Sequence, residues 1–565
     1  MVPDGAAGDD DFHELKPLQL PWRVNEQQRI EYVEQVLPFE AVLGEFTVPS
    51  RLSISRYVAG FVDGFSHHFP VIHMPTFSIT AVPNAPELVL AILAVGAQYR
   101  YETKAGIALY AASRAIIKCR IQRNELPDFH TVPFFHFSHP HTLPPDLPGT
   151  TRTILLLSTF SALQSDSTLL QESLSYRALL AYCVRQVGLS ELAEEGTAAV
   201  YPQNWQSWAK AETHRRTALF AFCFLNLQEA AFGIPPVLHV RELVLLHLPS
   251  SCSEWLTDSE AAWLSARRKD TLVDVSFGHA LKCVLKEGPA DEAVPVLSPS
   301  GNYILVHALL QRIALARQLA LSSGEMQGHQ EQLRRADVEE LEAAFDRWRQ
   351  EWRRAPESVL SVLQTRDSLA FTATALYGLA HIRLHFPYLA DAHFQTCDAE
   401  VVAKKIWEAP PPRRGPHLLR TLLHTVHALN VPVQLGVAYL ARSQALLWSV
   451  QHAVAGFECA VFLSKWLCAL AEDAESHVIS IGLEREITGW VKRVVREASE
   501  IELVESAQLS SQRHQLIILA VAVVRLWASI FSASNAAWPF VRLVGEGLER
   551  YAELLEEKYS VTMSV

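Results

Sequence analysis

The chain has 565 residues, of which 49% are hydrophobic and 19% are charged, so composition excludes both a collagen-like and a wholly disordered protein. Its 49 Lys and Arg residues against 61 Asp and Glu residues give a formal net charge of −12. Such a chain has no overall attraction for nucleic-acid phosphates or anionic membranes, so contact with DNA requires a local basic patch or a separate module.

The N-terminal segment is acidic and lacks the basic and apolar regions of a secretory signal peptide. The strongest apolar run, Leu516 to Val524, is far shorter than the ~20 residues that cross a bilayer, and it predicts a buried core helix. The eight cysteines are widely spaced, which indicates neither a CxxC zinc site nor a secreted disulfide framework. We therefore expect a reducing compartment, the cytosol or the nucleus, and no membrane association.

Helical periodicity dominates the chain. Apolar side chains repeat at the three- and four-residue spacing of one helix face in four clear stretches. These stripes are Leu88, Ile92, Val95 and Tyr99; Leu219, Phe222, Cys223 and Leu227; Leu435, Tyr439, Leu446 and Val450; and Val544, Leu548, Tyr551 and Leu555. Alternating strand patterns bounded by Gly or Asn-Gly turns are scarce. The sequence predicts an all-α protein, a large multi-helix bundle.

Loops rich in proline divide this pattern at residues 124–150, 287–301 and 408–416. We predict two helical blocks joined by Pro-rich linkers, since the middle loop separates segments of ordinary domain size. The predicted parts are a short, partly disordered N-terminal segment at 1–49, a block at 50–286, a linker at 287–301 and a C-terminal helical block at 302–565.

No phosphate-binding glycine loop, serine nucleophile elbow or HExxH zinc motif occurs, so no catalytic residue is assigned and the chain is not expected to be an enzyme. Histidines crowd into the first proline-rich loop at positions 130, 136, 139 and 141, but without neighbouring cysteines a solvated loop is favoured over a metal site. His381 and His385 share one helix face, where packing or surface histidines are favoured because two ligands do not specify a metal. We expect neither metal nor cofactor in this chain.

The segment from Trp205 to Thr217 places Glu212 three and four residues before Arg215 and Arg216 on a predicted helix. Such spacing allows ion pairs on one helix face. Two interpretations remain open: a surface ion pair worth a few tenths of a kcal/mol, or an arginine held at an effector cleft or interface. Spacing alone favours the surface pair.

A second basic segment mixes arginines with tryptophans. It contains Arg347, Arg349, Arg353 and Arg354 together with Trp348 and Trp352. Asp346 and Glu351 interrupt the positive charge, which favours a solvated helix over a DNA-binding surface.

Several segments in combination resemble the fungal-specific transcription factor regulatory domain, of the kind that follows paired two-cysteine, two-histidine zinc fingers. They are FSHHFPVIHMPTF at 65–77, PELVLAILAVGAQYR at 86–100, the segment 205–217, FGIPPVL at 232–238, YGLAHIRLH at 377–385, WSVQH at 448–452 and FECAVFLSKW at 457–466. The resemblance covers roughly residues 50 to 560 and implies an all-helical regulatory domain in a nuclear RNA polymerase II transcription factor.

The sequence departs from that family at its beginning. The first cysteine, Cys119, lies within the helical block, so the residues before this block cannot supply the thiolates of a zinc finger. Zinc is expected only with a finger module outside this sequence. The resemblance also leads to the hypothesis of a regulatory core, which comprises Tyr99, Arg100, Trp205, Trp208, Glu212, Arg215 and Arg216. Replacing both Arg215 and Arg216 by Ala is expected to change reporter output without unfolding the protein.

We therefore expect a fungal regulator of RNA polymerase II transcription, controlling a metabolic or secondary-metabolite gene cluster. The expected partners are promoter DNA through a missing or borrowed zinc-finger module, the transcription machinery or a partner transcription factor, and a small effector. One alternative is a finger-less helical scaffold that binds and modulates another transcription factor. Another is an α-helical enzyme with a His-lined pocket.

Overall fold

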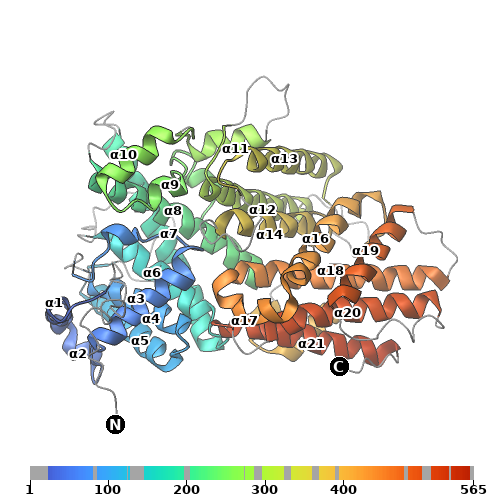
Figure 1. Ribbon diagram of the computed structural model, residues 1–565, viewed down its shortest axis with the longest axis horizontal. Coiled ribbons are helices and arrows are strands. Elements are labelled where there is room, and N and C mark those ends of the chain that lie inside the picture. The colour runs from blue at the N-terminus through green and yellow to red at the C-terminus, as the bar shows by residue number, and fades with distance from the viewer. Residues whose placement is uncertain are drawn as a thin grey trace, which may run out of the picture.

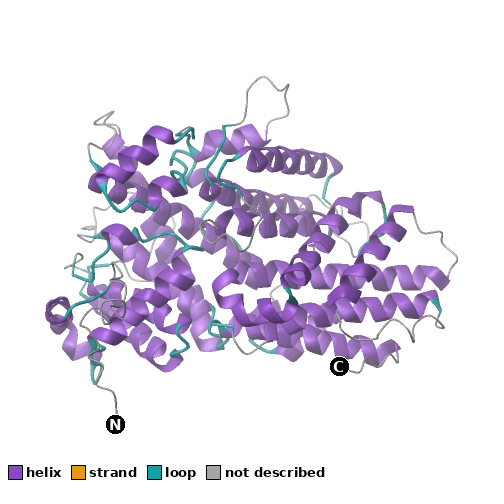
Figure 2. Cartoon of the chain, in the orientation of Figure 1, coloured by secondary structure: helices purple, strands orange, loops and turns teal. Residues whose placement is uncertain are grey.

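The fold was examined in a computed structural model. It describes residues 23–80, 85–123, 125–126, 146–195, 204–272, 274–285, 295–322, 333–358, 368–387, 393–475, 482–498, 511–532 and 536–559. Helices form almost the whole framework of these ranges (Figure 2). Within them extended pairing is limited to an isolated antiparallel bridge between His247 and Ser276. The predicted all-α class is confirmed.

The described N-terminal part of the molecule lies on one side of Figure 1 and consists of the helices labelled α1 to α11. They are α1 (Glu26–Val36), α2 (Glu40–Leu43), α3 (Arg51–Phe61), α4 (Pro86–Tyr99), α5 (Thr103–Gln122), α6 (Leu147–Ala162), α7 (Ser167–Glu195), α8 (Trp205–Phe232), α9 (Cys252–Trp255), α10 (Glu260–Lys269) and α11 (Phe277–Leu285).

The C-terminal part continues with long helices that extend to the other end of Figure 1. They are α12 (Pro299–Ser322), α13 (Arg335–Arg354), α14 (Ser368–His385), α15 (Ala399–Glu408), α16 (Leu419–Leu435), α17 (Val437–Leu447), α18 (Val450–Glu475), α19 (Gly482–Ala498), α20 (Gln512–Ser532) and α21 (Pro539–Tyr559).

Helix α4 lies at the centre of the N-terminal part, and all of its residues are buried. It begins with Pro86, which is well suited to the first turn because no intrahelical partner is available for an N–H there. Glycine allows close contact with α3: a Cβ on Gly96 would lie 1.8 Å from the carbonyl oxygen of Tyr57, and one on Gly60 would lie 2.3 Å from that of Gly96. The two backbones therefore touch at a distance that only glycine permits.

One continuous hydrophobic core includes helices from both predicted blocks. Phe220 of α8 stacks on Tyr303 of α12 with ring centroids 5.6 Å apart, and Phe232 of α8 meets Phe540 of α21 at 5.9 Å. Helix α12 begins at Pro299, so the last three residues of the predicted linker 287–301 are helical rather than loop. Positions 287–294 lie outside the described residues, and the division into blocks stays a prediction.

Two described helices are long and apolar enough to cross a membrane by length and composition, Val450–Asp473 and Gln512–Ser532. Of their most apolar windows, 94% and 67% respectively is buried inside the molecule. The run from Leu516 to Val524 forms part of α20 and packs into the core, as predicted.

Candidate functional site

The first turns of α8 carry most of the predicted regulatory core. The side chain of Asn204 caps this helix by accepting a hydrogen bond from the backbone N–H of Ser207 at 2.8 Å. Gly233, in the left-handed conformation, ends it. Helical spacing then turns Glu212 and Arg216 toward the loop before α9 and the start of α12.

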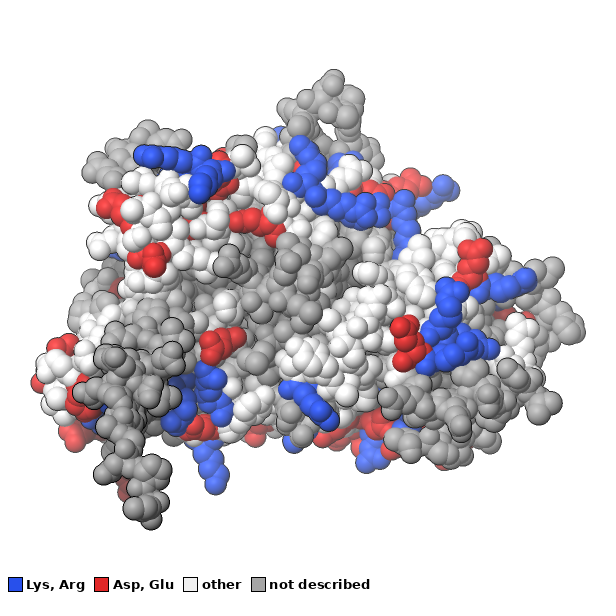
Figure 3. All heavy atoms as spheres, in the orientation of Figure 1, with Lys and Arg blue, Asp and Glu red and all other residues white. Residues whose placement is uncertain are grey.

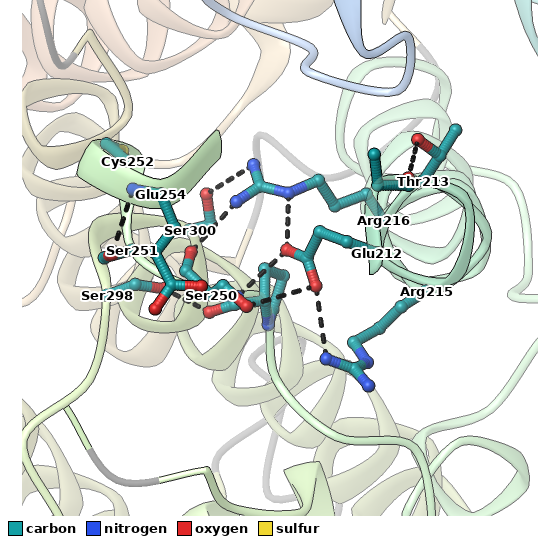
Figure 4. A network of polar contacts seen from close by, with 12 residues as sticks. Glu212, Thr213, Arg215, Arg216, Ser250, Ser251, Cys252, Glu254, Ser298 and Ser300 are labelled. Carbon is teal, nitrogen blue, oxygen red and sulfur yellow. Dashed lines mark hydrogen bonds and ion pairs between the residues drawn. The ribbon is translucent and has the colours of Figure 1, made fainter. Parts of the chain in front are cut away.

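Glu212 and Arg216 form the centre of a buried polar network (Figure 4). The Nε of Arg216 donates to Oε1 of Glu212 at 2.7 Å, and the two side chains are 1% and 0% exposed. The backbone N–H of Ser250 donates to the same carboxylate oxygen at 2.9 Å, while Nη2 of Arg216 donates to the Ser250 carbonyl at 2.9 Å. Arg215 pairs with the second carboxylate oxygen at 3.1 Å. The network ties α8 to the chain before α9.

The same arginine also reaches α12 and an aromatic ring. Its Nη1 lies 3.4 Å from the hydroxyl oxygen of Ser300, and its guanidinium carbon lies 4.2 Å from the ring centroid of Trp255. A desolvated cation over an indole face adds a favourable electrostatic contact. Arg216 therefore connects three segments that are far apart in the sequence.

A small aromatic cluster surrounds this contact. Trp208 packs on Trp263 with centroids 5.6 Å apart, and the imidazole of His73 lies 4.8 Å from Trp255 and 5.8 Å from Trp205. Burial, followed by the charge of the nearby guanidinium group, lowers the pKa of His73 to about 4, so the ring is neutral at pH 7. Trp205 and Trp208 both contact His73, and His73 contacts Trp255, the ring that Arg216 lies over.

The favoured interpretation of the α8 spacing, a surface ion pair, is wrong. Both Glu212 and Arg216 are buried and are hydrogen-bonded by residues from other segments. The spacing identifies the shared helix face correctly, but only the packing of the loop before α9 over that face decides its burial. Replacing Arg216 would leave a buried carboxylate without its main partner, so a change in stability is expected in place of an unaltered fold.

Tyr99 and Arg100 belong to a different place in the fold. The hydroxyl of Tyr99 accepts a hydrogen bond from Nε1 of Trp538 at 3.1 Å, and burial raises the pKa of this tyrosine to about 12. Arg100 forms an ion pair with Asp63 at 2.5 Å and donates to the Arg56 carbonyl at 3.3 Å. The seven predicted residues therefore form two groups with separate partners, one at the end of α4 and one at the start of α8.

The histidine predictions have two outcomes. The crowded histidines 130, 136, 139 and 141 lie outside the described residues. His381 is buried and stacks on His424 at 4.6 Å, while His385 contacts Glu342 at 3.2 Å and the His417 ring at 5.7 Å. The preferred interpretation of packing histidines is confirmed for this pair. Within the described residues, no three His, Cys, Asp or Glu side chains gather as a metal site would require.

The basic and aromatic segment of α13 is not the solvated helix that the charge pattern favours. Trp348 and Trp352 are buried, and their indole N–H groups donate to the carbonyls of Asn302 and Ala370 at 3.0 and 3.2 Å. Figure 3 shows Lys and Arg side chains gathered over α13 and over α19, with acidic side chains interspersed. The charge pattern describes only the outer face of α13, because the tryptophans occupy the inner one.

Sequence reasoning missed a cavity of about 700 Å³ beneath this helix. Its walls come from α13, α14, α16, α18, α19 and α20, and we call it the aromatic cavity because five tryptophans line it. They are Trp348, Trp352, Trp448, Trp490 and Trp527. Its size is typical of small-molecule sites. A sequence signal existed only as scattered tryptophans, and their convergence depends on how six elements pack.

Comparison with known proteins gives the family. Residues 58–350 match the family described as the fungal specific transcription factor domain, and residues 389–550 match the fungal transcription factor C-terminal domain. The first match alone covers more than half of the chain. The chain belongs to the fungal specific transcription factor domain family, as the sequence resemblance indicated.

One curated relative is the zinc finger protein zas1 of Schizosaccharomyces pombe, with 22% identity over 266 residues. The match covers 46% of this chain and 27% of the relative, so the similarity spans about a quarter of that longer protein. No solved structure matches this chain significantly.

Proposed function

We propose that this chain is the helical regulatory domain of a zinc-finger-type regulator of RNA polymerase II transcription, and that it acts in the fungal nucleus. The observation that carries the proposal is the pair of family matches, at 58–350 and 389–550, which together include most of the helices. The similarity to the zinc finger protein zas1 supports a link to zinc fingers. DNA would be read by a module other than the residues described above.

The buried network of α8 suggests how such a domain keeps a defined shape. Glu212 and Arg216 connect α8 with the chain before α9 and with α12, and both positions are inaccessible to solvent. Arg215 is less buried than Glu212, with 16% of its side chain exposed. We propose that Arg216 maintains the fold, while the partly exposed Arg215 contributes to a partner contact.

A tethered reporter tests the proposal. The full chain would be fused to a bacterial repressor's DNA-binding domain and expressed in yeast with a reporter that carries the matching operator. Reporter output should change several-fold in either direction, and a reporter without the operator should not respond. An unchanged output at normal protein abundance would refute the proposed regulatory role. Arg215→Ala should alter the response, and a melting curve of this variant shows whether it is still folded.

Control of a metabolic or secondary-metabolite gene cluster belongs to the same proposal, and transcript profiling after deletion of the gene tests it. Changes concentrated in one set of neighbouring genes would support it. Changes scattered over unrelated loci would contradict it and leave the broader regulatory role in place.

A further inference from the structure

The aromatic cavity stays open because small residues form much of its lining. These residues are Ala375 and Gly378 of α14, Ala428 of α16, and Ala455 and Gly456 of α18. Gly378 is buried, yet a Cβ added there would meet no neighbouring atom within 4 Å. The space beside it therefore belongs to the interior of the molecule. Apolar cavities of about 150 Å³ already take up benzene, so one of about 700 Å³ has room for a larger apolar molecule.

The tryptophans offer this space the carbon surface of their rings. The indole N–H groups of Trp348 and Trp352 are already used, because both donate to backbone carbonyls. The Nε1 atoms of Trp448 and Trp527 are closed off, each with less than 1 Å² of accessible surface. Four of the five tryptophans in the lining therefore present no free N–H group to a ligand. A bound molecule would gain from them by burying apolar area and by ring packing, not by hydrogen bonds.

Lining residues that could ionise are neutral. Burial lowers the pKa of His424 to about 4 and that of His452 to about 3, and it raises the pKa of Tyr377 to about 12. All three side chains are therefore uncharged at pH 7. The hydroxyl of Thr374 donates to the carbonyl of Phe371 at 2.7 Å, so it too has its partner within α14. An ionised ligand group beside these side chains would leave water without gaining a counter-charge.

The charged end of the cavity does not call for an ionic ligand either. Of the described lining residues two are charged, and both face water: Arg349 has 41% of its side chain exposed, and Arg353 is exposed. Arg349 pairs with Asp346 at 3.1 Å, and the same carboxylate pairs with Arg420 at 2.7 Å. The pKa of Arg420 is raised by its hydrogen bond to Asp346 and, less strongly, by the charge of Glu342. Carboxylates and water therefore serve this end without an anion from a ligand.

We propose that the aromatic cavity binds an uncharged molecule of two or more aromatic rings. Trp348 stacks on Tyr377 with ring centroids 4.9 Å apart, and Trp448 stacks on His452 at 5.2 Å, so a ligand ring would extend packing that the walls already contain. Aromatic pairs gain energy beyond the burial of their area, which favours such a ligand over an aliphatic one. The regulatory meaning of the site rests on the proposed function, because a bound molecule would hold α13 and α14 against α18 and α20. The binding itself does not depend on that function.

Glycines provide both a blocking variant and its matched control. Gly378→Phe should place a ring in the cavity without a backbone clash, and phenylalanine is a better helix former than glycine. Gly489 of α19 also has no neighbouring atom within 4 Å of an added Cβ, but it is not among the described lining residues, so Gly489→Phe is the control. Ala375→Phe is a second blocking variant, because Ala375 lines the cavity one turn before Gly378 and is partly exposed.

The test uses purified full-length protein and N-phenyl-1-naphthylamine as the probe, with binding measured by its fluorescence. The charged analogue, 8-anilinonaphthalene-1-sulfonate, has the same rings and adds an anion. The neutral probe should bind at one site and about tenfold or more tightly than the sulfonate, since the anion has to leave water for an uncharged lining. Gly378→Phe should weaken binding of the neutral probe by about tenfold or more, because the added ring takes its space, and Gly489→Phe should bind it like the unaltered protein.

Two results would overturn the proposal: binding of the sulfonate as tight as that of the neutral probe, or undiminished binding of the neutral probe to Gly378→Phe. A circular-dichroism melt of each variant shows that it is folded before the titration. If Gly378→Phe does not fold, Ala375→Phe takes its place with the same expected loss. Because probe fluorescence does not involve transcription, failure here is distinguishable from failure of the tethered reporter.

Discussion

Removing the buried arginine of α8 should destabilise the protein strongly. Arg216→Ala deletes the guanidinium that lies 2.7 Å from the carboxylate of Glu212, and both side chains are almost fully buried. With charge centres about 4 Å apart and an effective dielectric constant of about 20, the lost attraction is ~4 kcal/mol. Measured losses on breaking one side of a buried pair are similar, about 3–5 kcal/mol. We therefore expect a loss of about 4 kcal/mol.

The chain offers a matched control on a solvent-exposed helix face. Arg335 and Glu339 have the same four-residue spacing with the positions of acid and base reversed, and the same 2.7 Å contact, but their side chains are 92% and 60% exposed. Arg335→Ala should cost no more than about 0.5 kcal/mol, because water already screens this pair. The comparison isolates burial as the cause of the difference.

Urea denaturation followed by circular dichroism at 222 nm gives the free energy of unfolding of each variant. The double variant Glu212→Ala, Arg216→Ala should lose less free energy of unfolding than the sum of the losses of the two single variants. Each single variant leaves one buried charge of the pair without its partner, whereas the double variant removes both charges. A loss below about 1 kcal/mol for Arg216→Ala, or equal losses for Arg216→Ala and Arg335→Ala, would refute the buried-network reasoning.

Three further predictions concern glycine positions and acid stability. Gly378→Ala should raise the free energy of unfolding by about 0.5–1 kcal/mol, because its Cβ meets open space inside a helix; a lower melting temperature would contradict this. Gly96→Ala should cost at least about 1–3 kcal/mol, since its Cβ would clash with a backbone carbonyl of α3; an unchanged urea midpoint would contradict it. Burial lowers the pKa of three histidines to about 3: His68, His307 and His452. Below pH 6.5 these histidines therefore bind protons in the unfolded chain but not in the native chain. The stability that is present above pH 6.5 is lost as the pH falls, and the loss reaches ~2 kcal/mol for each histidine at about pH 5. Urea midpoints that stay constant between neutral pH and about pH 5 would exclude this; replacing His307, whose pKa is lowered by burial, by Gln should reduce the dependence.

The helical class could be predicted from the sequence because apolar residues repeat at helical spacing in several stretches, which indicates a period of 3.6 residues locally. The stripe through Leu88, Ile92 and Val95 lies in α4, and the apolar run from Leu516 lies in α20, where both are buried. The family was also accessible, because its motifs are contiguous segments. These features depend on neighbouring residues, which a sequence displays directly.

The candidate sites depended on contacts that a linear pattern does not contain. The spacing of Glu212 and Arg216 predicts that they meet, but the Ser250 backbone from another segment is what encloses and satisfies the pair. The alternation of arginine and tryptophan in α13 was interpreted from its charge, and the structure turns Trp348 inward. Whether a helix face is buried depends on which other segment packs over it, and the sequence of the helix alone does not show this.

The sequence by itself determined the helices, their apolar faces and the family to which they belong. Only the tertiary structure decided that Tyr99 and Glu212 lie in separate groups, that the α8 pair is buried, and that five tryptophans converge on one cavity whose lining includes Arg349. The physical reason is that helix formation follows from local spacing, whereas desolvation and the lining of a cavity arise only where distant segments pack together.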